Sequence, residues 1–275
     1  GGDFNTIPVT YNATSRGYFS DDPNHATIKT MDVRRGISWS SLIRSHEIPL
    51  DPISNNPNNI FDSWYYNDEQ ITGEFKILQP MTVTATYRSK DARFEYDTWE
   101  TVIREANKGL DNLKNYYNVD SFIGLEREVE YAGNKQLVRV ISEDTDLIAD
   151  SDNEVAALTF EFVNAIPGYA FDSNGAASYS QSSLRSILND RVRNNLEPIV
   201  AKKCKKVSKA TNNGMGKGGR INLEYTDDYV FIPSLYELNI LKNQTDEATE
   251  QEGYVYGYYA SQPDQQASHK KYYYT

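Results

Sequence analysis

The residues with the clearest capacity for chemistry are carboxylates between positions 143 and 154. Asp144, Asp146, Asp150, Asp152 and Glu154 place oxygen ligands at short spacing, and a bent loop could bring such oxygens together around Ca²⁺. The glycine that an EF-hand loop needs for its sharp turn is missing. The segment therefore predicts either a calcium site or an acidic surface loop.

Two further motifs have the composition of ligand sites. Gln262-Pro263-Asp264 matches the tripeptide with which calcium-dependent lectins select galactose, but the partner tripeptide Trp-Asn-Asp is absent. The glycine-rich stretch 212–219 lacks the Ser or Thr that follows Gly-Lys in a P-loop, and a predicted helix precedes it. We interpret the first motif as a chance match and the second as a connector.

Hydrolytic catalysis would require a nucleophile next to a base. His25, His46 and His269 lie in polar or loop-like contexts, and the sequence contains no Gly-x-Ser-x-Gly motif. Cys204 is the only cysteine and lies on the apolar side of a predicted helix, which disfavours thiol chemistry and leaves no intrachain disulfide. We therefore predict a protein that is not an enzyme and that needs no cofactor besides the calcium considered above.

Charge and hydropathy exclude two classes of partner. Acidic residues outnumber basic ones 39 to 28, giving a net charge of −11, whereas a phosphate backbone attracts clustered Lys and Arg. No apolar run approaches the roughly 18 residues of a membrane-spanning helix. The 21 tyrosines against 10 phenylalanines suit either a recognition surface or half-exposed sheets. We expect neither nucleic-acid binding nor membrane insertion.

The first 90 residues alternate like strands. The patterns predict strands at 9–12, 26–33, from Phe61, and at 81–87, with a loop at 51–59. A short helix at 38–43 would be capped by Ser38 or Ser40. We expect the core of this region to contain Trp39, Phe61, Trp64 and Phe75.

The polar stretch 89–95 is the expected boundary between two domains. Asp97 is the predicted cap of the next helix, with Glu100 at the capping-box position and Gly109 past the helix end. A hairpin is predicted across the turn at Gly133-Asn134. Further predicted elements are strands at 156–163 and 229–232, a helix capped by Ser182 or Ser183, and a helix at 197–207. The expected core residues of this second region are Trp99, Phe160, Leu184, Leu188 and Phe231.

Aromatic, glycine and proline positions in the first region follow a known pattern. The matching positions are Gly36, the segment 61–65 (Phe-Asp-Ser-Trp-Tyr), Thr72, Phe75, Pro80 and the segment 82–87 (Thr-Val-Thr-Ala-Thr-Tyr). With them the region resembles the internalin-type B-repeat, also called the Listeria–Bacteroides repeat. Ser63 and Tyr87 stand where this family usually has Gly and Trp. The resemblance implies a small β-grasp-like spacer domain of surface proteins, with no catalytic residue.

A second set of motifs covers the rest of the chain. It comprises the segments 98–100, 157–160, 183–185, 188–189 and 226–234 together with Ile103 and Glu237. With these the region resembles an uncharacterised C-type-lectin-like domain of Gram-positive gut bacteria and their phages. The family continues with two closing strands, so the resemblance implies that residues 270–275 approach a strand that a longer chain or a neighbouring subunit would complete. The alternative is that this branch of the family closes its sheet differently.

The sequence thus predicts an α+β protein of two domains, a β-grasp-like B-repeat domain (1–90) and a C-type-lectin-like domain (91–275). The expected function is adhesion or ligand binding without catalysis, outside the cell, on a Gram-positive cell surface or a phage virion. The alternative is a structural decoration or fibre subunit of a phage virion. Expected partners are a host-surface protein or glycan, or neighbouring subunits of the assembly.

Overall fold

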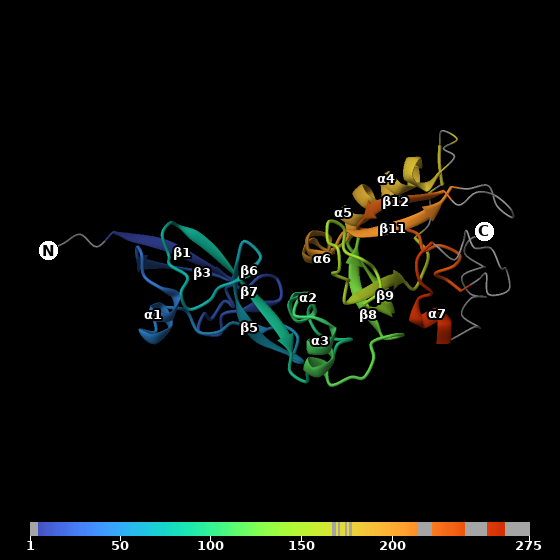
Figure 1. The fold of residues 1–275 in the computed structure, drawn as a ribbon. Coiled ribbons are helices and arrows are strands. Elements are labelled where there is room, and N and C mark those ends of the chain that lie inside the picture. Colours follow the sequence, from blue (N-terminus) through green and yellow to red (C-terminus); the bar gives the residue numbers. More distant parts are fainter. Residues whose placement is uncertain are drawn as a thin grey trace. The chain divides into compact units, whose positions relative to one another are not determined.

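The computed structural model describes residues 5–166, 169, 171–173, 175, 178–213, 222–239 and 252–261 (Figure 1). Helices and several sheets are present, which confirms the α+β class. The chain divides into two compact units, Gly1–Val102 and Ile103–Thr275. The expected linker 89–95 thus lies within the first unit, and the division falls inside a helix.

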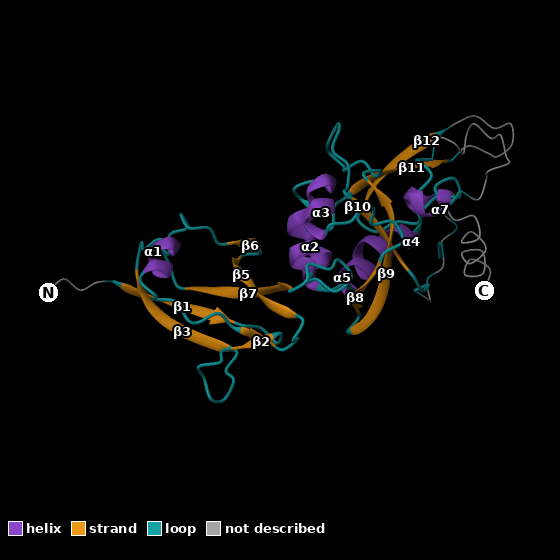
Figure 2. Cartoon of the chain, turned by 90° about the horizontal axis from the view of Figure 1, so that it is seen from below, coloured by secondary structure: helices purple, strands orange, loops and turns teal. Residues whose placement is uncertain are grey.

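The first unit is built on a five-stranded sheet in the order β3-β1-β7-β5-β6. β1 (Thr6–Asn12) lies between β3 (Ile28–Arg34), to which it is antiparallel, and β7 (Met81–Ser89), to which it is parallel. β7 pairs antiparallel with β5 (Asn59–Tyr66), which in turn pairs with β6 (Glu69–Gln70). Figure 2 shows these strands side by side, with helix α1 next to them.

Helix α1 (Trp39–Arg44) begins as predicted, because the Ser38 side chain accepts a hydrogen bond from the backbone N–H of Ser41. The predicted loop 51–59 is only partly a loop. Its residues Ile53–Ser54 form the short strand β4, which pairs with β2 (Gly17–Tyr18).

Aromatic side chains fill the core between α1 and the sheet. Trp39 and Trp64 are buried, and the Tyr11 ring meets the Trp64 ring edge-on at 5.2 Å between centroids. Phe61 and Phe75 are half-buried and pack against this core. A bulge between Phe61 and Ser63 explains how residues three apart on one strand share a face, since one extra residue reverses the alternation.

Helix α2 (Trp99–Ala106) starts with a different cap from the predicted one. The Thr98 hydroxyl, not Asp97, accepts the hydrogen bond from the N–H of Thr101. Asp97 instead accepts bonds from the N–H groups of Ser89 and Thr98, which fastens the end of β7 to the helix start. Glu100, one position away from a capping box, forms an ion pair with Arg16.

The second unit contains a three-stranded antiparallel sheet and a separate two-stranded one. β8 (Glu126–Tyr131) and β9 (Asn134–Glu143) form the predicted hairpin, and β10 (Leu158–Phe162) pairs with the other side of β9. The two turn residues, Ala132 and Gly133, both have positive φ (49° and 76°), as a type I′ turn requires. β11 (Val207–Asn212) pairs with β12 (Leu223–Asp228).

The helices of the second unit are short. In chain order after α2 they are α3 (Leu110–Tyr117), the 3-10 helix η1 (Tyr179–Gln181), α4 (Ser183–Ile187), the π-helical turn η2 (Leu188–Val192), α5 (Arg193–Asn195), α6 (Pro198–Lys203) and α7 (Gly257–Ser261). The predicted cap of α4 is confirmed, since the Ser182 side chain accepts from the N–H of Arg185.

Two predictions about the second unit are wrong. The helix predicted at 197–207 ends at Lys203, and Val207 already begins β11. No strand forms at 229–232, because the Asn189 side chain bonds the backbone there. Its Oδ1 accepts from the N–H of Tyr229 (2.7 Å) and its Nδ2 donates to the carbonyl of Val230 (3.1 Å). The segment 270–275, expected to approach a closing strand, lies outside the described residues.

The buried centre of the second unit also differs from the predicted one. Its fully buried side chains include Ile141, Leu238, Tyr256, Tyr258 and Tyr259. The residues expected there, Phe160, Leu184, Leu188 and Phe231, are half-buried, and Trp99 belongs to the first unit. Three tyrosines at 256–259 thus occupy the centre in place of the predicted residues, and the hydroxyl groups of Tyr256 and Tyr259 bring the polar partners Asp146 and Glu161 to it. In the described part of the chain, no helix is long and apolar enough to cross a membrane.

Candidate functional site

The five carboxylates of the predicted calcium site lie in different environments. Asp146 is buried, and its carboxylate accepts hydrogen bonds from other side chains. Asp144 and Asp150 sit at turns with positive φ, while Asp152 and Glu154 are exposed. Among the described residues, no three potential metal-binding side chains converge on one point. This arrangement supplies no calcium cage around Asp146.

Asp146 belongs instead to a buried polar cluster that the sequence did not reveal. Lys209 donates to Asp146 Oδ1 (2.8 Å), to Glu237 Oε1 and to the Tyr256 hydroxyl (2.8 Å). Tyr256 and Thr159 also donate to Asp146, at 3.0 Å and 2.6 Å. We call Asp146, Thr159, Lys209, Glu237 and Tyr256 the lysine cluster. All five side chains are at most 8% exposed.

Local structure positions Lys209 and Glu237 within the lysine cluster. Lys209 follows Val207 on the inward side of β11. Glu237 is held by a reciprocal pair of bonds, because Ser234 N–H donates to Glu237 Oε2 and Glu237 N–H donates to Ser234 Oγ. Gly253 has φ of 109°, and a Cβ there would lie 2.5 Å from Glu237 Oε1, so only glycine leaves room for this carboxylate.

Burial sets the electrostatics of the lysine cluster. It raises the pKa of Glu237, an effect that the nearby Lys209 charge opposes, and it also raises the pKa of the Tyr256 hydroxyl. The cluster holds one lysine and two acidic side chains in a buried site, where unpaired charge is costly.

A second buried network joins two of the motifs that carry the family resemblance. Asp228, fully buried, accepts from Arg185 Nε (2.8 Å), Asn189 Nδ2 (2.9 Å) and Thr226 Oγ1 (2.7 Å). The segments 183–189 and 226–230 therefore meet in space. Because Asn189 also binds backbone at 229–230, the network determines the local fold and presents no free group.

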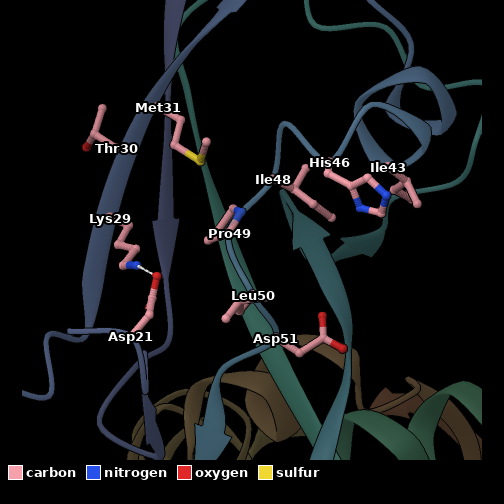
Figure 3. Close-up of a pocket in the computed structure, with 10 residues that line it drawn as sticks. All are labelled: Asp21, Lys29, Thr30, Met31, Ile43, His46, Ile48, Pro49, Leu50 and Asp51. Carbon is pink, nitrogen blue, oxygen red and sulfur yellow. Dashed lines mark hydrogen bonds and ion pairs between the residues drawn. The ribbon is translucent and has the colours of Figure 1, made fainter.

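The first unit carries an open groove of about 660 Å³ (Figure 3). One wall is β3, and the other is the end of α1 with the loop that follows it. The side chains around the groove are Asp21, Lys29, Thr30, Met31, Ile43, His46, Ile48, Pro49, Leu50 and Asp51. Half of these side chains are apolar, and none of them is Phe, Tyr or Trp.

The groove exposes aliphatic surface beside a strand edge. Ile43 and Leu50 are 46% and 63% exposed. The groove touches three consecutive residues of β3, Lys29, Thr30 and Met31. Neighbouring residues of a strand point to opposite faces of the sheet. A groove that touches all three therefore follows the edge of the strand. β3 is the outermost strand of its sheet. An ion pair of Lys29 with Asp21 lies at one end, and Asp51, whose pKa is raised by burial, lines another part.

The other groups considered for chemistry are dispersed. His25 stacks on Tyr18 at 4.2 Å between centroids, and His46 lines the groove. Cys204 is half-buried, and burial raises the pKa of its thiol, which opposes formation of the reactive thiolate. His269 and the tripeptide 262–264 lie outside the described residues, as does most of the glycine-rich stretch 212–219.

Comparisons of the chain with protein-family models, with curated proteins and with solved structures gave no match.

Proposed function

We propose that this chain is a non-catalytic, surface-exposed binding protein that acts in adhesion, and that the groove of the first unit is its contact site. The observation that carries the proposal is the exposed aliphatic lining beside the outer edge of β3. Large apolar side chains that remain exposed together mark interaction sites on soluble proteins.

The chemistry of the groove favours a protein partner over a glycan. An extended segment can pair its backbone with an outer strand while its alternate side chains enter a neighbouring pocket. The aliphatic lining suits Leu, Ile or Val side chains of such a segment, whereas the polar groups at the groove would fix its register. We therefore assign the partner as a host-surface protein with an extended apolar segment.

The two family resemblances are consistent with the proposed binding function. A mixed sheet with parallel central strands β1 and β7 and one packed helix supports a β-grasp-like first domain. The Asp228 network, which joins the motifs at 183–189 and 226–230, supports a C-type-lectin-like second domain. Both resemblances are to surface or virion proteins, which supports an extracellular setting for the groove.

Cell binding tests the proposal. Labelled full-length chain is titrated onto cultured intestinal epithelial cells, the host surface suggested by the resemblance to gut-bacterial proteins. We expect saturable binding that is abolished by protease treatment of the cells and survives periodate oxidation of their glycans. Binding lost with periodate alone would replace the protein partner by a glycan, for which a glycan array with and without calcium is the next assay.

Paired variants locate the contact site. Leu50→Ser and Ile43→Ser change the groove, while Leu78→Ser and Ile53→Ser change residues of similar exposure (57% and 46%) that do not line it. Loss of binding in the first pair only supports the groove. Equal loss in both pairs, or a chain that binds no cells and assembles into large oligomers in solution, would favour the alternative of a structural virion subunit.

A further inference from the structure

The lysine cluster places an amine against a carboxyl group in a buried site. Lys209 Nζ is bonded to Glu237 Oε1 and lies 2.8 Å from Asp146 Oδ1. Aromatic rings surround it, with the Phe231 centroid at 4.4 Å and the Tyr256 centroid at 5.2 Å. Side-chain exposure is 7% for Lys209, 2% for Glu237 and 5% for Asp146.

These are the conditions under which an amine and a carboxylic acid condense. In water the two groups remain an ion pair, since hydration stabilises both charges. In an apolar site the neutral forms gain relative to the charged ones, and groups held in contact react with a large effective concentration. The remaining requirement is a second acid–base group within reach of the same nitrogen, and Asp146 meets it.

We propose that Lys209 and Glu237 form an intramolecular amide bond, with Asp146 as the group that transfers the proton. Asp146 carries one proton from the Lys209 ammonium to the Glu237 carboxylate, and the free amine attacks Cδ of the resulting carboxylic acid. Asp146 then takes a second proton from the attached nitrogen and gives it to the hydroxyl oxygen on Cδ, which leaves as water as its bond to Cδ breaks. The sum is one ammonium and one carboxylate giving one amide and one water, with no oxidant or activated co-reactant.

The hydrogen bonds distinguish the roles of the two carboxyl groups. Asp146 accepts from the hydroxyls of Tyr256 and Thr159, which hold its side chain in place beside the Lys209 nitrogen. Glu237 has one oxygen on Ser234 N–H and the other on Lys209. Burial raises the pKa of Glu237, so the acid form needed for attack is accessible. After condensation Asp146 keeps both hydroxyl donors.

The amide bond would join β11 to the turn that contains Glu237, across 28 positions of sequence. Such a covalent link restricts the unfolded chain much as a disulfide does, and it does so in a chain with one cysteine. The lysine cluster would then act as a built-in crosslink of the second unit.

Intact-mass spectrometry of the full chain under denaturing conditions tests the bond. We expect a mass one water below that of the sequence, and tandem spectra of a protease digest in which the Lys209 peptide is joined to the Glu237 peptide. Asp146→Asn keeps the shape of the proton-transfer group, so we expect this variant to fold and to show the full sequence mass. Lys114→Met, which removes an ion pair with Glu143, is the matched control and should retain the loss of water.

The results that would overturn the proposal are specific. One is a full sequence mass for a wild-type chain whose circular dichroism shows that it is folded. Another is a loss of water that persists in Lys209→Met, because the dehydration would then lie elsewhere. A crosslink from Lys209 to Asp146 would refute the assignment of roles.

Discussion

The groove of the first unit and the lysine cluster of the second depart from ordinary protein surfaces and cores in opposite ways. The groove leaves aliphatic side chains such as Leu50 in water, while the cluster removes Lys209 and two carboxylates from it. Each arrangement costs free energy unless a partner compensates it. The cluster has its partners within the chain, whereas under the proposed function those of the groove come from another molecule. Burial of charge and exposure of apolar side chains thus distinguish the two regions better than charge or composition does.

Removal of Lys209 should produce the largest effect on stability. Lys209→Met leaves Asp146 and Glu237 buried without their partner, whether Lys209 is held there as a cation or through the proposed amide bond, and loss of one partner of a buried ion pair costs about 3–5 kcal/mol in other proteins. We expect the free energy of unfolding of the second unit to fall by that amount in urea titrations followed by circular dichroism. Lys135→Met, which removes an exposed ion pair with Glu128, should cost less than about 1 kcal/mol. Equal effects would remove the distinction on which the contrast rests.

Truncation of Trp64 should destabilise the first unit by about 3–5 kcal/mol, as for other buried aromatic residues. Trp64→Ala removes a ring that packs against Tyr11 and Phe61. Tyr96→Ala, at a residue 64% exposed, is the control and should change stability by less than about 0.5 kcal/mol. Thermal unfolding of both variants measures the difference, and a small effect at Trp64 would show that the groove does not rest on a packed core.

Loss of the Asn189 side chain should destabilise the second unit by about 1–3 kcal/mol, the usual cost of leaving buried polar groups unpaired. Asn189→Ala removes bonds to Asp228 and to the backbone of Tyr229 and Val230. Asn134→Ala, at the exposed first residue of β9, serves as the control. Equilibrium unfolding in urea compares them, and unchanged stability in Asn189→Ala would mean that the network does not hold the segment after β12.

Acid should weaken the second unit through Glu105. Burial acts to raise the pKa of this carboxyl, but hydrogen bonds from Asn112, Lys108 and Arg104 outweigh it and lower the pKa. As pH falls, Glu105 therefore takes up its proton in the unfolded chain before it does so in the folded chain. The stabilisation that Glu105 contributes is present above the pKa it has in the unfolded chain. It is lost as pH falls through the lower pKa that it has in the folded chain. In Glu105→Gln the melting temperature should decline less steeply below about pH 5 than it does in the wild-type chain. An unchanged decline would contradict this.

Local signals were sufficient to predict part of the fold. Ser38 and Ser182 cap their helices as expected because an N-cap depends on residues only three positions away. The hairpin of β8 and β9 follows from Gly133, whose positive φ the turn requires. The cap of α2 moved by one residue because Asp97 is engaged by Ser89 of β7, a contact that no local pattern contains.

The lysine cluster could not be predicted from the sequence in the same way. Asp146 and Tyr256 are 110 positions apart, and Lys209 lies between them in sequence. Lys209 falls between the helix predicted at 197–207 and the connector predicted at 212–219, where no element was predicted, so its inward position on β11 was not apparent. Asp146 was grouped with its acidic neighbours in the sequence, because only its burial, which the sequence pattern does not show, distinguishes it from them. The groove was missed because the segment 46–51 has no periodicity that indicates which side chains remain exposed.

The binding assay on Leu50→Ser, performed together with its thermal unfolding, tests the central claim most directly. The side chain is 63% exposed, so its replacement should change stability by no more than about 0.5 kcal/mol. We predict that Leu50→Ser unfolds like the wild-type chain and loses saturable cell binding, while Leu78→Ser keeps both. Full binding by a folded Leu50→Ser chain would contradict the assignment of the groove as the contact site.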